Sequence, residues 1–552
     1  MSHRYQDIVI TPPQGRGYLD HVFLARQLAE SRLDSIFESA TVPEGLRLLL
    51  YNEVDAGLGD VAFATKLMRL LRRHVPSLEI VLVSSGPEKQ GRFGLPDGVS
   101  MYEFKSYKGE ASEDHRRIDL VVSAPGIFDH CRDPNTVLET LGLDLSTPFL
   151  FIAEYGSMRQ LRDDAFKVHM EGVDKVLDTY LDEVALQKGL DPDSVGYRSS
   201  TGEVVSVVDG VVTSLGHLAG CLAADRADNP LLPWLVQPML KARSAGFDTG
   251  EIGIFIEDEL EPPPTQPCRS SLRERLEDEE LGTLLGNHEN ALYVGYGHSA
   301  HGFFVDYVAV LEESNQRSID VVIPHAASVT QAYDAIVTRP LVERLHKAGV
   351  GRLVLIGNPS EEGSEEIVER RVRELGEGKT LCLITRYPLP HSDMRTLLHM
   401  SEPSTMVSGD QSFSEAVSAR KECVVIEPVY CQTFHLDAQL ALAERVSPDL
   451  RFLLEFAMKF AWDDVGWVTV RQTLQSDRTR ELFQRFNELT HTEHRLNERI
   501  ISLVKRGLIT SRSSELRLAF SEVLRVACDG FAAGRGFTLL GDDLHALAQR
   551  IP

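Results

Sequence analysis

SGDQSFSEAVSARKECVVIEPVYCQTFHLD (residues 408–437) is the stretch that decides the fold. It opens with a turn of small and polar residues. The pattern then predicts a short helix over 413–419, a buried strand over 422–427 and a second helix led by His435. The amide groups at the start of the first helix and the positive end of its dipole point to one place. This order therefore predicts an edge that binds a diphosphate without a P-loop.

The same alternation of strand and helix continues on the N-terminal side of this stretch. Apolar runs that end in polar residues are typical of buried parallel strands. One series of strands is expected at 46–54, 78–86, 118–126 and 148–156, with a helix over 61–75. Further strands are expected at 250–258, from 289, and at 319–325, 351–360 and 380–390, with a charged helix over 361–375. Two such series predict an α/β chain with two Rossmann-like domains, and after 449 only helices are expected.

Length and charge limit the classes of function. With 552 residues the chain predicts two or three domains, and 43% hydrophobic residues can form a large core. No run approaches the ~20 apolar residues of a membrane span, and the N-terminus lacks the apolar segment of a signal peptide. The net charge of -25 argues against binding nucleic acid. Seven cysteines without a C-x-x-C pair indicate buried, reduced thiols, so we expect a cytoplasmic protein.

The loop 55–60 follows the first strong strand and contains two glycines and two aspartates, Asp55, Gly57, Gly59 and Asp60. The glycines let the backbone turn tightly and approach a ligand. Asp60 is either an N-cap of the next helix or a general base in the cleft, with Asp55 as the second candidate. Residue 62 is Ala and no acid ends the following strand, which disfavours a nicotinamide site.

Donor-binding candidates come from three other strand ends. After the strand that starts near 289, His298 and Ser299 either donate to phosphate oxygens or belong to a capped, exposed helix start. Arg386 and Tyr387 either flank a base or lie on the surface. The candidates in the opening stretch are Asp410, Gln411, Ser412, Phe413, Ser414 and Glu415. Of these, Asp410 is also the expected N-cap, the amides of Phe413 and Ser414 face the diphosphate, and Glu415 accepts from ribose hydroxyls or simply belongs to the helix.

Several motifs are missing from the sequence. It contains no Walker A, H-E-x-x-H or EF-hand pattern and no D-x-D in a loop at a strand end. We therefore expect no metal and no cofactor.

Two segments resemble known glycosyltransferases. GLGDVAFATKLMRLLRRHVPSLEIVLV (residues 57–83) resembles the first βαβ unit of GT-B enzymes of the heptosyltransferase kind. GDQSFSEAV (409–417), with the strand and helix after it, is similar to the donor site of bacterial protein-arginine rhamnosyltransferases, whose pattern is close to G-E-D-S-F. Asp60 matches that family's proposed base, and Asp410, Gln411 and Ser412 match the residues that hold ribose and diphosphate. Here Asp and Gln replace Glu and Asp, and Asp437 stands where the family has a Lys.

The resemblance implies a GT-B fold, in which two Rossmann-like domains face each other across a cleft. We expect an acceptor domain over 1–245, a donor domain over 246–445 and a helical extension over 446–552 that packs back on the first domain. The implied activity is an inverting, metal-independent transfer of a hexosyl or deoxyhexosyl group to a protein, peptide or glycan.

Other functions stay open at this point. The same fold accommodates a sugar-nucleotide epimerase or a pyruvyl transferase. The chain also fits a non-catalytic nucleotide-sugar-binding protein with the helical extension as its working surface.

Overall fold

The computed structural model divides the chain into two compact units. Unit 1 comprises Met1–Ile252 and Leu496–Pro552, and unit 2 comprises Gly253–Arg495. These limits differ from the expected boundaries at 245 and 445. The C-terminal helices do not form a separate segment, because those before Leu496 pack within unit 2 and those after it within unit 1.

The structure describes part of the chain, and everything below refers to that part. The described residues are 6–10, 31–54, 59–125, 134–153, 197–200, 203–208, 211–214, 242–247, 251–257, 269–286, 289–297, 301–324, 337–357, 369–386, 389–427, 433–459, 476–526 and 537–552, apart from positions 92, 114, 116, 146, 514, 521, 524 and 525.

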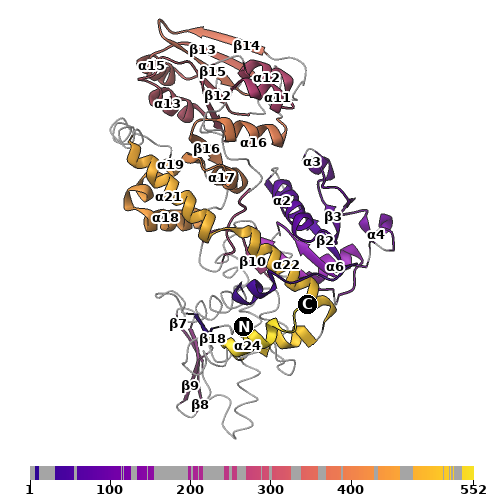
Figure 1. The fold of residues 1–552 in the computed structure, drawn as a ribbon. Helices are drawn as coiled ribbons and strands as arrows, with labels where there is room; N and C mark the ends of the chain where they lie inside the picture. Colours follow the sequence, from indigo (N-terminus) through magenta and orange to yellow (C-terminus); the bar gives the residue numbers. More distant parts are fainter. Residues whose placement is uncertain are drawn as a thin grey trace, which may run out of the picture. The chain divides into compact units, whose positions relative to one another are not determined.

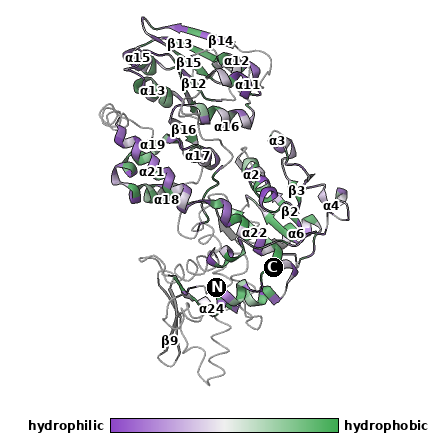
Figure 2. Ribbon diagram, in the orientation of Figure 1, coloured by the Kyte–Doolittle hydropathy of each residue, from purple (hydrophilic) through white to green (hydrophobic). Residues whose placement is uncertain are grey.

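Unit 1 is built on a six-stranded parallel sheet with the strand order β10-β6-β5-β2-β3-β4 (Figure 1). Its strands are β2 (Arg47–Asn52), β3 (Glu79–Ser84), β4 (Val99–Glu103), β5 (Leu120–Ser123), β6 (Phe149–Ala153) and β10 (Ala242–Ser244). The central strand β2 is buried on both faces from Leu48 to Asn52, as a parallel strand under two helical layers should be. Hydrophobic colour accordingly follows β2 and β3 in Figure 2.

Helices cover both faces of this sheet. The helices of unit 1 are α2 (Gly59–His74), α3 (Pro87–Gly91), α4 (Tyr107–Glu110), α6 (Pro134–Leu141), α22 (Leu496–Arg512) and α24 (Gly541–Ala548). Side chains of α4 and α6 form one core with alternate residues of β2, β3, β5 and β6. On the other face α2 packs on β2, and α22 packs on α2 and β5. Helix α22 belongs to unit 1 for this reason.

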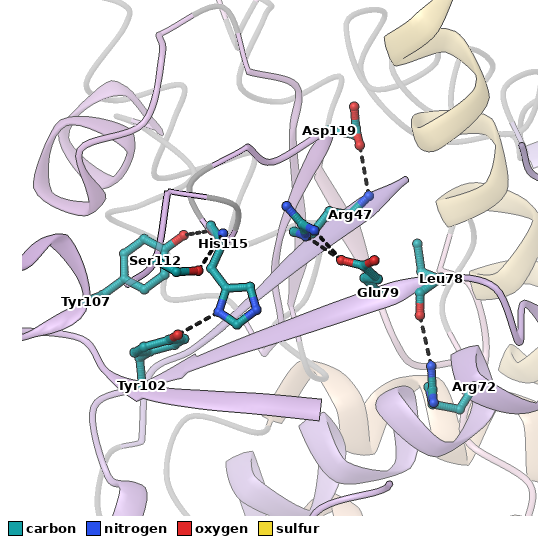
Figure 3. Close-up of polar contacts among 9 residues, drawn as sticks. All are labelled: Arg47, Arg72, Leu78, Glu79, Tyr102, Tyr107, Ser112, His115 and Asp119. Carbon is teal, nitrogen blue, oxygen red and sulfur yellow. Dashed lines mark hydrogen bonds and ion pairs between the residues drawn. The ribbon is translucent and has the colours of Figure 1, made fainter. Parts of the chain in front are cut away.

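Polar contacts fix the amino end of β2 and the loop after β4 (Figure 3). Arg47 Nε donates to Glu79 Oε2 at 2.7 Å, and the Arg47 amide donates to Asp119 Oδ2 at 2.8 Å. In the same view the Tyr102 hydroxyl lies 2.6 Å from His115 Nδ1, and Tyr107 donates to the His115 carbonyl at 2.5 Å. The Arg47 contacts therefore hold the amino end of β2, whereas the Tyr102 and Tyr107 contacts hold the segment after the carboxyl end of β4.

Smaller elements complete unit 1. A short helical turn, η1 (Ser35–Phe37), contacts α22 and shares a separate small core with α24. The strands β1 (Ile8–Ile10) and β18 (Phe537–Leu539) pair antiparallel. A three-stranded antiparallel sheet contains β7 (Tyr197–Ser200), β8 (Glu203–Val208) and β9 (Val211–Ser214). Only helices were expected after 449, so β18 corrects that expectation.

Unit 2 contains a seven-stranded sheet with the order β14-β13-β15-β12-β11-β16-β17. Its strands are β11 (Ala291–Gly295), β12 (Ile319–Val322), β13 (Val350–Gly357), β14 (Glu369–Glu374), β15 (Lys379–Ile384), β16 (Ser404–Ser408) and β17 (Glu422–Glu427). All pairs are parallel except β13 with β14. The predicted α/β class with two Rossmann-like sheets is therefore confirmed.

The helices of unit 2 cover both faces and the β17 edge. They are η4 (Arg269–Ser271), α11 (Leu272–Arg275), α12 (Glu279–Gly286), α13 (His301–Leu311), α15 (Arg339–Lys347), α16 (His391–Met400), α17 (Gly409–Ser418), α18 (Thr433–Val446), α19 (Pro448–Lys459) and α21 (Asp477–Glu493). Helices α13 and α15 form the main core with the sheet, and α16 packs on β11. Helices α19 and α21 pack along β17 and protect this edge strand from pairing with another chain.

Two further expectations in unit 2 are wrong. The charged helix expected over 361–375 is replaced at its C-terminal end by β14, because pairing with β13 overrides the local preference of a charged segment. No strand forms at 250–258 among the described residues; Ile254 makes an isolated bridge to Arg495. Gly253 precedes it with a φ of 97°, which breaks the extended backbone that the apolar pattern suggested.

Candidate functional site

Each sheet reverses its strand order beside its first strand. In unit 1 the chain passes from β2 to β3 and β4 on one side, and then returns to β5 on the other side of β2. In unit 2 it passes from β11 to β12, β13 and β15, and then to β16 on the other side of β11. Ligands of open α/β sheets bind outside the carboxyl ends of the strands at such a reversal. The predicted loops after β2, β11 and β16 all lie at these two points.

At the reversal in unit 1, Asn52 connects three segments. This last residue of β2 is fully buried, and its Nδ2 donates to the Asp60 carbonyl at 3.1 Å and to the Ala124 carbonyl at 3.3 Å. The start of α2 and the end of β5 are therefore held to the end of β2 by one side chain. Sequence reading missed Asn52 because it interpreted this residue only as the polar end of an apolar strand.

Asp60 lies in the first turn of α2 and is half-buried. A carboxylate there is stabilised by the positive end of the helix dipole, by about 0.3–1 kcal/mol for an exposed group. Gly59 is the first residue of the same helix. Asp55 and Gly57 lie outside the described residues. The backbone of Asp60 is thus fixed by Asn52, and its carboxylate lies at the edge where a general base is expected.

At the reversal in unit 2, the first turn of α17 follows β16 directly. Ser408 is the N-cap, with extended backbone, and its side chain makes no capping hydrogen bond. The Ser412 hydroxyl instead accepts from the Ser408 amide at 3.0 Å and donates to the Ser408 carbonyl. Within the described chain the buried Ser408 Oγ has no hydrogen-bond partner. Gly409 has a φ of 74°, which only glycine adopts without strain.

The other predicted residues of α17 differ in burial and in hydrogen bonding. Gln411 and Ser414 are buried, and the Phe413 side chain lies in the core. Because α17 begins at Gly409 and not at 413, the amides of Phe413 and Ser414 lie inside the helix, past the helix-start amides that have no partner within it. The backbone of Asp410 belongs to the first turn, and its side chain is not described. Ser412 uses its hydroxyl within the turn.

Glu415 lies near a residue that sequence reading did not identify. Its Oε1 is 2.9 Å from Nε2 of His391, the first residue of α16, and the two side chains are 15% and 17% exposed. The two residues are 24 positions apart in the sequence. No periodicity or motif could have paired them.

Arg386 is not a surface residue, because its guanidinium is mostly buried in ion pairs. Its Nε lies 3.0 Å from Asp278 Oδ2, its Nη2 lies 3.8 Å from Glu280, and its side chain is 12% exposed. The ion pair fixes the end of β15 to the start of α12. Tyr387, His298 and Ser299 lie outside the described residues.

The ends of β11 and β17 also meet at this reversal. His301 Nε2 lies 2.8 Å from the Gly297 carbonyl, and this imidazole is buried. A Cβ atom at Gly297 would lie 2.9 Å from the buried carboxylate of Glu427 and 2.8 Å from Met406 Cε. Sequence reading placed Glu427 only as the end of a strand.

Two kinds of feature are absent from the described residues. They contain no group of three or more His, Cys, Asp or Glu side chains that could hold a metal ion. None of the helices formed by these residues is both long and apolar enough to cross a membrane.

Comparison with known proteins finds similarity only at the level of structure. No protein-family model matches the chain, and no curated protein matches its sequence. Among solved structures, a UGT transferase from Siraitia grosvenorii in complex with UDP is 11% identical, with 84% of this chain and 99% of that one covered and a TM-score of 0.38. A glycosyltransferase from Rickettsia africae is 8% identical, with 84% and 96% covered and a TM-score of 0.34.

A third structure, a family 9 glycosyl transferase from Veillonella parvula, is 11% identical, with 81% of this chain and 99% of that one covered and a TM-score of 0.33. Scores of this size do not by themselves establish a common fold or activity. The chain is similar to these glycosyltransferases without being assigned to a family.

Proposed function

We propose that the protein is a glycosyltransferase of the GT-B type, which transfers a sugar from a nucleotide-diphosphate donor to an acceptor with inversion and without a metal. The observation that carries the proposal is the start of α17. Its N-cap side chain makes no capping bond and it lies where strand order reverses. A helix start of this kind binds phosphate through its amides and dipole.

The donor binds through unit 2 in this proposal. The diphosphate is held by the amides of the first turn of α17, after the positive-φ Gly409. Glu415, on the same helix, accepts hydrogen bonds from the ribose hydroxyls. The oriented amides stabilise the charge that develops on the departing diphosphate, which is the role a metal has in other transferases.

The acceptor is activated by unit 1. Asp60, at the start of α2, removes a proton from the acceptor nucleophile. The nucleophile then forms a bond to the anomeric carbon from the face opposite the leaving group. The bond from that carbon to the phosphate oxygen breaks, and its electron pair leaves with the nucleoside diphosphate. The acceptor is a protein, a peptide or a glycan.

A panel of nucleotide sugars tests the proposal. We expect one or more of them to raise the melting temperature of the full chain, and to be slowly hydrolysed in the absence of acceptor. Activity should persist after incubation with EDTA. Thermal stabilisation without hydrolysis or transfer would indicate a binding protein, and an epimerised sugar would indicate an epimerase. A panel that neither stabilises the chain nor turns over would contradict the proposal.

A further inference from the structure

An imidazole and a carboxylate from two helices of unit 2 meet near the start of α17. His391 Nε2 and Glu415 Oε1 are 2.9 Å apart. An ionised carboxylate only accepts hydrogen bonds, so the imidazole donates through Nε2. Both side chains keep a small exposed fraction, 17% and 15%, so that a bound molecule can reach them.

The helix that carries His391 is held by four further polar contacts, made by three of its residues. Asp393 accepts from the amides of Glu277 at 2.8 Å and Asp278 at 2.9 Å, and Ser392 donates to the Glu277 carboxylate at 2.7 Å. Arg395 Nε lies 2.6 Å from a carboxylate oxygen of Glu257. Burial raises the pKa of Asp393 even though the two amides act in the opposite direction. The first turn of α16 is therefore fixed independently of Glu415.

The position of Glu415 along α17 suits the sugar of a nucleotide. Gly409 starts the helix and Glu415 follows six positions later. At a rise of about 1.5 Å per residue the two lie roughly 9 Å apart along the axis. A diphosphate at the helix start and the ribose attached to it span a distance of this order.

We propose that His391 is a positioning residue that holds Glu415 ready to accept from a ribose hydroxyl, so that the site selects ribonucleotides over 2′-deoxyribonucleotides. The inference rests on the proposed function, because it requires a nucleotide at α17. A carboxylate has two oxygens and about four acceptor positions. Because the imidazole fixes the orientation of Oε1, the carboxylate cannot rotate away from the position in which it accepts from the ribose hydroxyl. It therefore cannot adapt to a deoxyribose. Acceptors aligned with a hydroxyl reject the ligand that lacks it, since the buried group then loses a partner.

Binding of paired nucleotides tests the inference with the full chain. The probes are UDP and 2′-deoxy-UDP, GDP and 2′-deoxy-GDP, and ADP and 2′-deoxy-ADP, measured by calorimetry. For the base that binds, we expect the natural protein to prefer the ribonucleotide by about tenfold. In His391→Leu, which removes the donor at similar volume, the preference should fall to about twofold. His391→Gln, which keeps a donor, should restore most of it.

A neighbouring variant separates this role from loosening of α16. Ser392→Ala removes a hydrogen bond from the same turn without touching Glu415, and the ribose preference should stay unchanged. In a Glu415→Ala background, His391→Leu should have no further effect on the preference. Equal weakening of both nucleotides in His391→Leu would overturn the inference and leave the proposed function standing. Absence of binding by every probe to the natural protein would overturn both.

Discussion

The strands β2 and β16, one at each reversal of strand order, end in opposite ways. In unit 1 the last side chain of β2, Asn52, donates two hydrogen bonds that join α2 and β5, and the helix that follows has an acid in its first turn. In unit 2 the last side chain of β16, Ser408, makes no capping bond at the start of α17. At one edge the last side chain of the strand bonds to two neighbouring segments, and at the other it leaves the helix start without a capping bond. The same topology therefore allows a strand end closed by its own side chain in one unit and an uncapped helix start in the other.

The carboxylate of unit 1 gives the largest expected effect. Asp60→Asn should lower the transfer rate by about 10²–10⁴-fold, because it removes a general base. Donor affinity should stay within about twofold, since the donor binds through unit 2. Steady-state transfer with saturating donor and calorimetry of donor binding give the two values.

Glu53 supplies the matched control at the same edge. Its carboxylate accepts from the Tyr51 hydroxyl at 3.1 Å and lies before the α2 turn. Glu53→Gln should keep transfer within a few-fold. If Asp60→Asn kept full turnover, the proposal that unit 1 supplies the general base would be wrong.

Asn52 and Ser408 test the difference in hydrogen bonding directly. Asn52→Ala leaves the Asp60 and Ala124 carbonyls without this donor, so unit 1 should lose about 1–3 kcal/mol of stability. Ser408→Ala removes a hydroxyl that has no partner in the described chain, and unit 2 should change by no more than about 0.5 kcal/mol. Hydrogen exchange in peptides from β2, β5, β16 and β17 resolves the two units. Equal losses in the two variants would mean that the contrast between the edges is wrong.

Gly409 tests whether the open helix start needs its backbone conformation. A residue with a side chain at a φ of 74° costs about 1–2 kcal/mol, although the space around the new Cβ is empty. In Gly409→Ala we expect the strained turn to relax and the affinity for a nucleoside diphosphate to fall by about tenfold. Calorimetric titration measures this change.

Gly349 is a control with the same conformation elsewhere in unit 2. It has a φ of 78° and equally open surroundings, and follows α15. Gly349→Ala should lose a similar amount of stability with no change in nucleotide affinity. An unchanged affinity in Gly409→Ala would argue against ligand binding at the first turn of α17.

The smallest expected effect concerns pH and the residue that precedes β17. Burial lowers the pKa of Lys421 to about 7, against the opposite influence of Glu402 and Glu422. The unfolded chain then binds more protons than the folded one above pH 7, so stability rises with pH from about 7 toward the ordinary lysine value. The limit is about 1.4 kcal/mol per pH unit for one proton.

Urea unfolding of unit 2 at pH 7 and pH 8, monitored by hydrogen exchange in β16 and β17, measures this rise in stability. Lys421→Met should remove it. A slope that persists in that variant would assign the effect to another group. Because Lys421 lies beyond the C-terminal end of α17, the nucleotide affinity of the natural protein should not follow the same curve.

Local sequence patterns predicted the elements whose apolar runs and turn residues lie within the element itself. The strand at 422–427 was expected with the observed limits of β17, and the βαβ unit from β2 to β3 was expected within two residues at each end. The glycine turn at the start of α17 was also recognised. Each of these depends on apolar runs and turn residues within a short window, which act on the backbone locally.

The contacts that define the candidate site carry no local signal. Asp278 is 108 residues from Arg386, and Glu415 is 24 residues from His391. The sequence could therefore nominate Arg386 for a base, and only the fold showed that it pairs with the start of α12. The strand β14 escaped prediction for the same reason, since a charged segment becomes a strand only when β13 lies beside it.

By itself the sequence determined that two α/β sheets form and that a glycine turn opens the helix after β16. Tertiary structure alone decided which helices of the C-terminal part joined which unit, and which side chains met at the two reversals. The physical reason is that the need to bury an apolar face specifies the type of an element and the period of its residues. A hydrogen bond or ion pair between distant segments depends instead on which strands become neighbours in the sheet.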